Sequence, residues 1–303
     1  MPSTHDNLAI LGFCRIIIAL WELVVTKAQP FSVHELLLPP EADADCESNR
    51  REIRRLKRWE KRHGHQGSEK RNRLRKNPPY NKMAGRASRP KTTRVYDLFL
   101  RMGYPAQDGA GYLIPQHLSP ELRRAILMLN KCDSSNFVMK SLLTQLLQTI
   151  DRDIRVDWYV VVPAPRFEIR VAAMPLPDLH SVLLITTPSG AQTILDLTGE
   201  QFGFDPKDQI CSLHDYLRNN VVKPGEWSAA RYTSDTEVHE QTVEWALQGN
   251  HFCQAARREV GSLFWDWIAE VSDGRLGGDQ ASCEQWMKST LASKLNSFSE
   301  TSL

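Results

Sequence analysis

The sequence lacks the short signatures of several large enzyme classes. It contains no glycine-rich phosphate loop, no dinucleotide-binding G-x-G-x-x-G, no G-x-S-x-G and no H-E-x-x-H, which disfavours nucleotide and zinc-protease chemistry. Its six cysteines are widely scattered and form no C-x-x-C pair, so a disulfide scaffold, a zinc ribbon and a thioredoxin-type redox pair are unexpected. We therefore expect reduced thiols, no cofactor and no bound metal.

Charge is unevenly distributed along the chain, although the formal net charge is only +2. Residues 50–94 contain 18 Lys and Arg against 3 Asp and Glu, a local charge of +15, which leaves −13 on the remainder. The basic segment loses its apolar periodicity after Arg62, and we predict that residues 46–94 form a largely disordered linker. With Trp59 and Tyr80 available to stack on bases, the linker is also suited to weak nucleic-acid contacts.

Near the N-terminus, residues 8–25 form a mostly apolar run that is interrupted by Arg15 and Glu22. A membrane span would carry both charges through hydrocarbon at about 2–3 kcal/mol each. We therefore expect a buried or docking helix here and a cytoplasmic or nuclear location, with an N-terminal membrane anchor as the alternative. Residues 1–45 are predicted to form this helix and an acidic exit.

From residue 95 onward the apolar pattern predicts helices, then an antiparallel sheet, then helices again, which is an α+β domain over residues 95–271. Ser119 is a favourable N-cap with a proline at the first helical position. Residues 272–303 are rich in Gly and Ser and are predicted to form a flexible C-terminal tail. The expected helices cover residues 95–105, 120–129, 139–150, 210–218, 237–247 and 260–271, and the expected strands cover 156–162, 167–173 and the two arms of a hairpin over 179–203.

This hairpin segment, LHSVLLITTPSGAQTILDLTGEQFG, is the most informative stretch of the sequence. His180 begins a β-branched run, Pro188-Ser189-Gly190 forms a turn, and the returning strand ends at Asp196. Pairing of the two strands brings His180 and Asp196 near one another. An imidazole beside a carboxylate can hold one tautomer and accept a proton from a nucleophile.

The histidine-led strand, the turn and the Asp196-Leu197-Thr198 ending resemble the transglutaminase-like branch of the papain-like superfamily. The block H-x-V-L followed by L-D-L-T-G-x-Q-F-G also resembles uncharacterised fungal proteins. The first resemblance implies a cysteine at the N-terminal end of a helix that packs on the sheet, and Cys132 lies just before the strongest predicted helix. The order Cys132, His180, Asp196 is the family order, which implies thiol-dependent amide or ester hydrolysis, or acyl transfer, on a protein or small-molecule acyl substrate.

Two features of the sequence leave other functions open. Asp133, Ser134 or Ser135 would be the natural N-cap, which would place Cys132 slightly outside the helix. A non-catalytic accessory or interaction protein on the same fold, for example in a fungal specialised pathway such as secondary metabolism, is the main alternative. The second alternative is nucleic-acid binding through residues 50–94.

Overall fold

The computed structural model describes residues 4–27, 31–37, 94–102, 114, 118–171, 179–222, 230–233 and 251–301. Most of the predicted linker 46–94 and all of the predicted helix 237–247 lie outside these described residues, so those two predictions are not tested. The fold is mixed helix and strand, as the sequence pattern predicts.

Six helices and two short 3₁₀ helices are described. The helices are α1 (Thr4–Lys27), α3 (Pro120–Leu127), α4 (Cys132–Gln148), α5 (Leu213–Asn220), α7 (His251–Ser272) and α8 (Gln280–Thr301), and the 3₁₀ helices are η2 (Gly199–Phe202) and η3 (Pro206–Gln209). The strands are β1 (Phe31–Leu37), β2 (Arg94–Met102), β3 (Arg155–Val161), β4 (Phe167–Val171), β5 (His180–Thr186), β6 (Gln192–Leu195), β7 (Ile210–Ser212) and β8 (Ala230–Thr233).

The main sheet has the strand order β7-β6-β5-β3-β8, and all of its neighbouring strands are antiparallel. Its central strand β5 is buried along its whole length, because helices cover both faces of the sheet. The predicted hairpin is present: β5 pairs with β6, with Leu183 opposite Leu195. Gly190 adopts a φ of 81° in the turn, a conformation that favours glycine.

A smaller sheet has the order β1-β2-β4. Its middle strand β2 corrects the prediction of a helix over residues 95–105. β2 pairs antiparallel with β1 and parallel with β4, so its backbone hydrogen bonds are made to two other strands. A short apolar run is ambiguous between helix and strand, and here the tertiary pairing decides the outcome.

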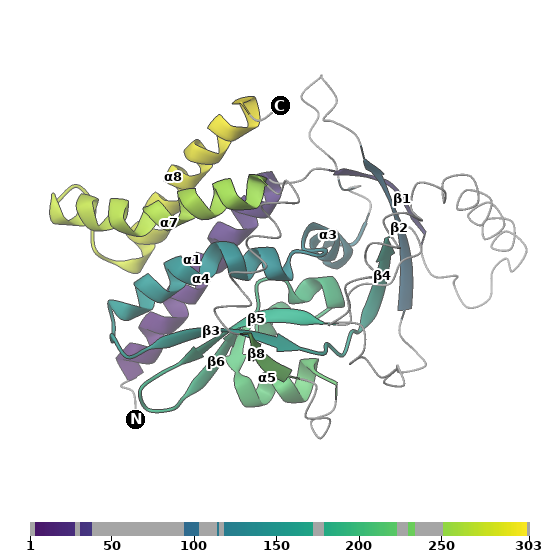
Figure 1. Ribbon diagram of the computed structural model, residues 1–303, viewed down its shortest axis with the longest axis horizontal. Helices are drawn as coiled ribbons and strands as arrows, with labels where there is room; N and C mark the ends of the chain where they lie inside the picture. The colour runs from purple at the N-terminus through teal and green to yellow at the C-terminus, as the bar shows by residue number, and fades with distance from the viewer. Residues whose placement is uncertain are drawn as a thin grey trace, which may run out of the picture.

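Two hydrophobic clusters lie on opposite faces of the main sheet. Leu183 and Leu195 belong to the cluster packed under the long helices, whereas Val182 and Leu184 belong to the cluster on the side of α3, α5 and η2. Figure 1 shows the long helices α1, α4, α7 and α8 together on one side of the molecule. Alternate residues of β5 therefore serve two separate cores, as the period of a strand requires.

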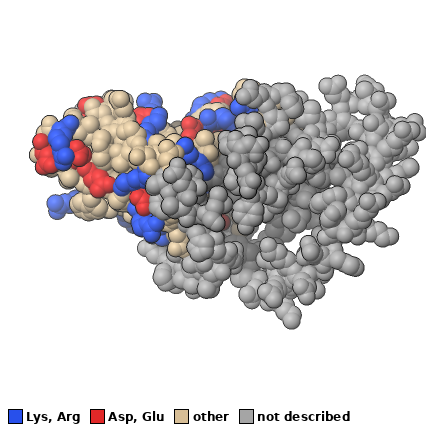
Figure 2. Space-filling view, turned by 90° about the horizontal axis from the view of Figure 1, so that it is seen from above, with Lys and Arg blue, Asp and Glu red and all other residues tan. Residues whose placement is uncertain are grey.

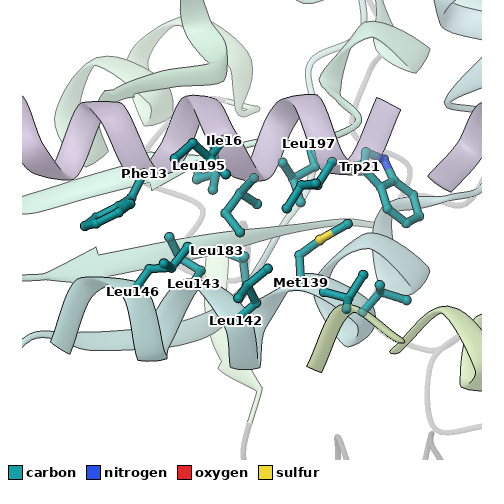
Figure 3. Packing of buried hydrophobic residues seen from close by; sticks show 14 of the residues in the cluster. Phe13, Ile16, Trp21, Met139, Leu142, Leu143, Leu146, Leu183, Leu195 and Leu197 are labelled. Atoms are coloured by element: carbon teal, nitrogen blue, oxygen red, sulfur yellow. The ribbon is translucent and has the colours of Figure 1, made fainter. Parts of the chain in front are cut away.

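Helix α1 is part of the core of the fold. Figure 3 shows Phe13, Ile16 and Trp21 packed with Leu142 and Leu183, and Ile16 and Trp21 are at most 2 % exposed. By length and composition alone, α1 is the one described helix that is apolar enough to cross a membrane. In the structure, its apolar face covers the helix α4 and the sheet.

The C-terminal region corrects the prediction of a flexible tail over residues 272–303. Residues 280–301 form α8, and Cys283, Met287, Leu291 and Leu295 face the core at intervals of four residues. The Gln280 side chain donates a hydrogen bond of 2.7 Å to the Ala9 carbonyl, which ties the start of α8 to α1. The helical spacing was present in the sequence, but the many Ser and Lys residues between the apolar positions concealed it.

Candidate active site

His180 and Asp196 form a buried pair at one end of the main sheet. The Nε2–H of His180 donates to Oδ2 of Asp196 over 2.9 Å, and the two residues are 0 % and 1 % exposed. His180 begins β5 and Asp196 directly follows β6, so the antiparallel pairing of these strands places the two side chains together. The structure thus brings together two of the three residues predicted from the sequence.

Two further donors hold the Asp196 carboxylate. The backbone N–H of Thr198 donates to Oδ1 over 3.0 Å, and the hydroxyl of Tyr216 on α5 donates to Oδ2 over 2.6 Å. A carboxylate that accepts three hydrogen bonds is fixed in orientation and favoured in its charged form. Gly199 lies so close that a Cβ atom there would collide with this carboxylate and with the Phe204 ring.

The pair is charged at neutral pH. Burial alone would lower the pKa of His180, but the charge and hydrogen bond of Asp196, together with Cys132, outweigh burial and raise this pKa from 6.5 to about 10. Burial would raise the pKa of Asp196, yet the charge and hydrogen bond of His180 and the bonds from Tyr216 and Thr198 hold it below its usual range. An imidazolium beside a carboxylate follows.

Cys132 is the first residue of α4, and this corrects the predicted cap. The N-cap is Lys131, which makes no side-chain capping bond, in place of Asp133, Ser134 or Ser135. The first backbone bond of this turn runs from the N–H of Ser135 to the carbonyl of Lys131. The thiol therefore stands inside the first helical turn, where free N–H groups and the helix dipole stabilise negative charge.

Cys132 lies near His180, and its thiol contributes to the raised pKa of the ring. Because Asp196 occupies Nε2, the ring nitrogen left for the thiol is Nδ1. Within the described part of the chain, Nδ1 is buried and has no hydrogen-bond partner. The Cys132 Sγ instead lies 4.0 Å from Oδ1 of Asp133.

The Asp133 carboxylate is bound to the sheet. Its Oδ1 accepts a short hydrogen bond of 2.5 Å from the hydroxyl of Ser181, the residue that follows His180. The bond fastens the first turn of α4 to the start of β5. The carboxylate next to Cys132 thus has a structural partner, which the sequence alone did not reveal.

A second link joins the loop after Asp196 to the loop before Cys132. The side chain of Gln201 accepts a hydrogen bond of 3.0 Å from the N–H of Asn130 and donates one of 3.3 Å to the Thr198 hydroxyl. Asn130 has a φ of 55°, the left-handed conformation that asparagine tolerates better than most residues. Gln201 therefore fixes the turn from which α4 starts.

The neighbouring Glu200 connects the same loop to α1. Its Oε1 accepts a bond of 2.7 Å from Arg124 on α3, and Arg124 also binds Glu22 on α1 over 2.5 Å. Burial raises the pKa of Glu200, and the charge of Arg124 opposes this shift. The charged residue that interrupts the apolar N-terminal run is thus part of a chain of ion pairs that ends beside Asp196.

Aromatic rings enclose His180. The rings of Phe202 and Phe204 lie 4.8 and 6.2 Å from the imidazole, both near edge-to-face. Cys132 itself is only 7 % exposed, so the site is closed in this structure. An open groove of about 560 Å³ lies elsewhere, between α1 and α8, and contains none of these residues.

Sequence reasoning missed Tyr216, Gln201 and Ser181 as parts of the site. Their contacts span 20, 71 and 48 residues, and no local pattern encodes such distances. A weak signal existed for Gln201, which belongs to the L-D-L-T-G-x-Q-F-G block. Among the described residues, no group of three or more His, Cys, Asp or Glu side chains is arranged to hold a metal ion.

Comparisons with known proteins add no relative that would assign this site. No family model, no curated protein and no solved structure matches the chain.

Proposed function

We propose that the chain is a thiol-dependent amide or ester hydrolase, or an acyltransferase, with a transglutaminase-like or papain-like core. One observation carries the proposal: a cysteine in the first turn of a helix lies near a buried histidine whose Nε2 is bound to a carboxylate and whose Nδ1 has no hydrogen-bond partner among the described residues. Cys132 is the nucleophile, His180 the base and acid, and Asp196 the residue that orients His180.

The chemistry follows from these positions. In the resting site the proton of the Cys132 thiol is held on Nδ1 of His180, and the thiolate attacks the carbonyl carbon of an amide or ester. The free N–H groups in the first turn of α4 are suited to hold the oxyanion of the tetrahedral intermediate. His180 then returns the proton to the leaving amine or alcohol, and a thioester remains on Cys132.

The second half of the reaction releases the acyl group. Water or an amine attacks the thioester while His180 accepts its proton. Collapse of the intermediate yields a carboxylic acid or a new amide, and the proton returns to the Cys132 sulfur. Asp196 stays ionised throughout and keeps the Nε2–H of His180 directed at itself, so that Nδ1 faces the thiol.

The first experiment compares two cysteines of equal burial. Cys132 and Cys253 are 7 % and 8 % exposed, but Cys132 lies near His180 whereas Cys253 lies near Lys131. An ordinary thiol is a few per cent ionised at pH 7, so a preformed thiolate should react with iodoacetamide at least about tenfold faster. Site-resolved mass spectrometry measures both rates in one sample, and equal rates would exclude an activated nucleophile.

The second experiment tests acyl transfer to the thiol. p-Nitrophenyl acetate should give a burst of about one p-nitrophenol per chain, which marks accumulation of an acyl-enzyme. The burst should vanish in Cys132→Ala and persist in Cys253→Ala, the matched control. If Cys132→Ala retains the burst, the assigned nucleophile is wrong.

A second candidate function is a non-catalytic interaction protein on the same fold. The closed site favours it, because Cys132, His180 and Asp196 are 7 %, 0 % and 1 % exposed and a substrate must open the site to reach the sulfur. For this function, Cys132→Ala would leave the biological activity intact. Loss of that activity in a folded Cys132→Ala variant would reject it.

The basic segment 50–94 is the basis of a separate proposal, weak nucleic-acid binding. On the face shown in Figure 2, the described surface carries Lys and Arg interspersed with Asp and Glu. This mixture supports assigning any phosphate binding to the segment instead of to the folded part. The affinity for DNA should fall steeply with salt concentration, and deletion of residues 50–94 should remove both the affinity and its salt dependence.

We also propose a cytoplasmic or nuclear location. The support is the packing of α1, whose apolar residues build the core beneath α4, so membrane insertion of α1 would open that core. Cell fractionation with alkaline carbonate extraction should recover the protein in the soluble fraction. Retention in the extracted membranes would contradict this location.

A further inference from the structure

Tyr216 occupies a special position beneath the candidate site. It lies in the second turn of α5, a helix whose N-cap Ser212 accepts a hydrogen bond from the N–H of Asp215. The side chain is fully buried, and its ring packs edge-to-face against Phe204 at 6.2 Å. Its hydroxyl donates to Asp196 over 2.6 Å.

The acceptor of this bond is the oxygen that His180 also uses. Tyr216 and His180 both donate to Oδ2 of Asp196, while Oδ1 receives the N–H of Thr198. Each donor to a carboxylate takes up part of its negative charge and makes it less basic. The phenol therefore competes with the imidazole for the same charge.

Tyr216 can serve only as a donor here. Burial and the nearby charge of Asp196 raise the pKa of Tyr216 well above its usual value, so the hydroxyl keeps its proton at neutral pH. Asp196 keeps its charge over the same range. The bond is thus a constant influence on the histidine across the working pH range.

Other titratable groups also lie near the Asp196–Tyr216 pair, and removal of the Tyr216 hydroxyl changes none of these residues. They are His180 on β5, Cys132 on α4, Glu200 on η2, Asp208 in η3 and Cys211 on β7. Removing only the Tyr216 oxygen leaves each of them in place, so any change in titration reports the lost bond.

We propose that Tyr216 is a positioning residue that sets the pH window in which Cys132 and His180 exist as a thiolate–imidazolium pair. This inference rests on the proposed function. Without the hydroxyl, Asp196 keeps more negative charge on Oδ2, and the coupled cluster binds its protons more tightly. The pH at which the thiolate–imidazolium pair forms and the pH at which it loses its remaining proton then both rise. Both shift together because the titration steps belong to the cluster as a whole.

The test uses Tyr216→Phe, with Tyr96→Phe as the matched control for loss of a buried tyrosine hydroxyl outside the site. The rate of Cys132 alkylation by iodoacetamide is measured against pH. Loss of one hydrogen bond to a charged group should shift the profile upward by about one pH unit, and Tyr96→Phe should leave it unchanged. An unchanged or downward-shifted profile in folded Tyr216→Phe would overturn the proposal.

A second variant keeps the shape of the side chain and should reverse the direction of the pH shift. Fluorotyrosine at position 216 is a more acidic phenol and a stronger donor, so the same profile should move to lower pH. A purely structural role predicts no such opposite shift. This variant also tests the positioning role of Tyr216 if Tyr216→Phe does not fold.

The failure of Tyr216 as a positioning residue is distinguishable from failure of the proposed function. Titration of the His180 ring by NMR needs no reactive thiol. If Cys132 reacts no faster than Cys253, the proposed function fails, and the NMR titration still tests Tyr216. If Cys132 is activated but the His180 titration is the same in all Tyr216 variants, only the present inference fails.

Discussion

The two halves of the candidate site are held very differently. On the base side, the Asp196 carboxylate receives three hydrogen bonds from His180, Tyr216 and Thr198. On the side of the proposed nucleophile, α4 starts without a side-chain cap at Lys131, and the Cys132 thiol lies 4.0 Å from Oδ1 of Asp133. The proposed base is thus held directly by hydrogen bonds, and the proposed nucleophile is restrained mainly through its neighbours.

This difference matches what each half must do in the proposed reaction. Asp196 keeps one charge and one orientation from start to finish, so rigid bonding favours catalysis. The sulfur of Cys132 must lose a proton, form a bond to carbon and break it again. A thiol locked in a strong hydrogen bond would lose that bond at every turnover. Four substitutions test this difference between the two halves.

The largest effect is expected from Asp196→Asn. The neutral amide cannot stabilise the imidazolium, and its NH₂ group favours the wrong histidine tautomer. Alkylation of Cys132 at pH 7 should fall by roughly 10²–10³-fold, the scale of general acid–base catalysis. Asp153→Asn, an exposed change of the same chemistry, is the control. An unaffected rate would mean that Asp196 only caps the turn at Thr198.

The second change, Arg124→Gln, tests the scaffold behind the base. It leaves Glu200, a 5 % exposed carboxylate, without its cation. We expect the free energy of unfolding at pH 7 to fall by about 1–2 kcal/mol, less than for a fully buried pair because Arg124 is 40 % exposed. Urea unfolding measures this loss, and Arg123→Gln, an exposed neighbour, is the control.

The pH dependence of this variant has a definite sign. The folded pKa of Glu200 is raised above its ordinary value of 4.5, so its protonated form favours the native state. That contribution is complete below the unfolded pKa and is lost as the pH rises through the folded pKa. Removing Arg124 raises the folded pKa further, so the difference between variant and native protein should shrink as the pH falls toward 4.5. A constant difference would show that Glu200 is not the cause.

The third change, Gln201→Leu, separates the two halves directly. It removes the bond that holds Asn130 before α4 but leaves every donor to Asp196 in place. Alkylation of Cys132 should slow about tenfold, which corresponds to one hydrogen bond of about 1.4 kcal/mol. The NMR titration of His180 should stay unchanged, as should both readouts in the exposed control Gln285→Leu. A shifted His180 titration would show that the halves are not independent.

The smallest effect is expected from Ser181→Ala. The change removes the donor to Asp133 and frees a carboxylate beside the sulfur, which disfavours the thiolate. The alkylation rate should fall by only a few-fold, since Asp133 is partly exposed and gains water in exchange. Ser189→Ala in the exposed turn is the control. A faster rate would mean that the bond to Ser181 restrains the nucleophile unproductively.

The parts of this fold that depend on local periodicity could be predicted from the sequence. The hairpin of β5 and β6 and the Ser119 cap of α3 are confirmed, because a turn or a cap is encoded within a few residues. The strand β2 and the helix α8 were predicted wrongly, since their state depends on partners far along the chain.

The same limit of local sequence patterns applies to the candidate site. His180 and Asp196 lie on one hairpin, so their proximity follows from strand pairing. The position of Cys132 relative to them depends on how α4 meets the sheet, through Gln201 and Ser181. Tyr216 enters from a different helix altogether. Residues that orient other residues leave no spacing pattern in the sequence, and only the tertiary structure reveals them.

The packing of α1 against α8 has a consequence for biosynthesis. The Lys27 side chain binds Asn296, and Gln280 binds the Ala9 carbonyl, so the first described helix is completed by the last. About 250 residues separate them, which a ribosome adds in roughly 10–50 s. For that interval, a 24-residue apolar helix emerges without its final partner. The nascent chain therefore needs a chaperone or rapid docking on α4, and its exposure to aggregation is greatest before the fold is complete.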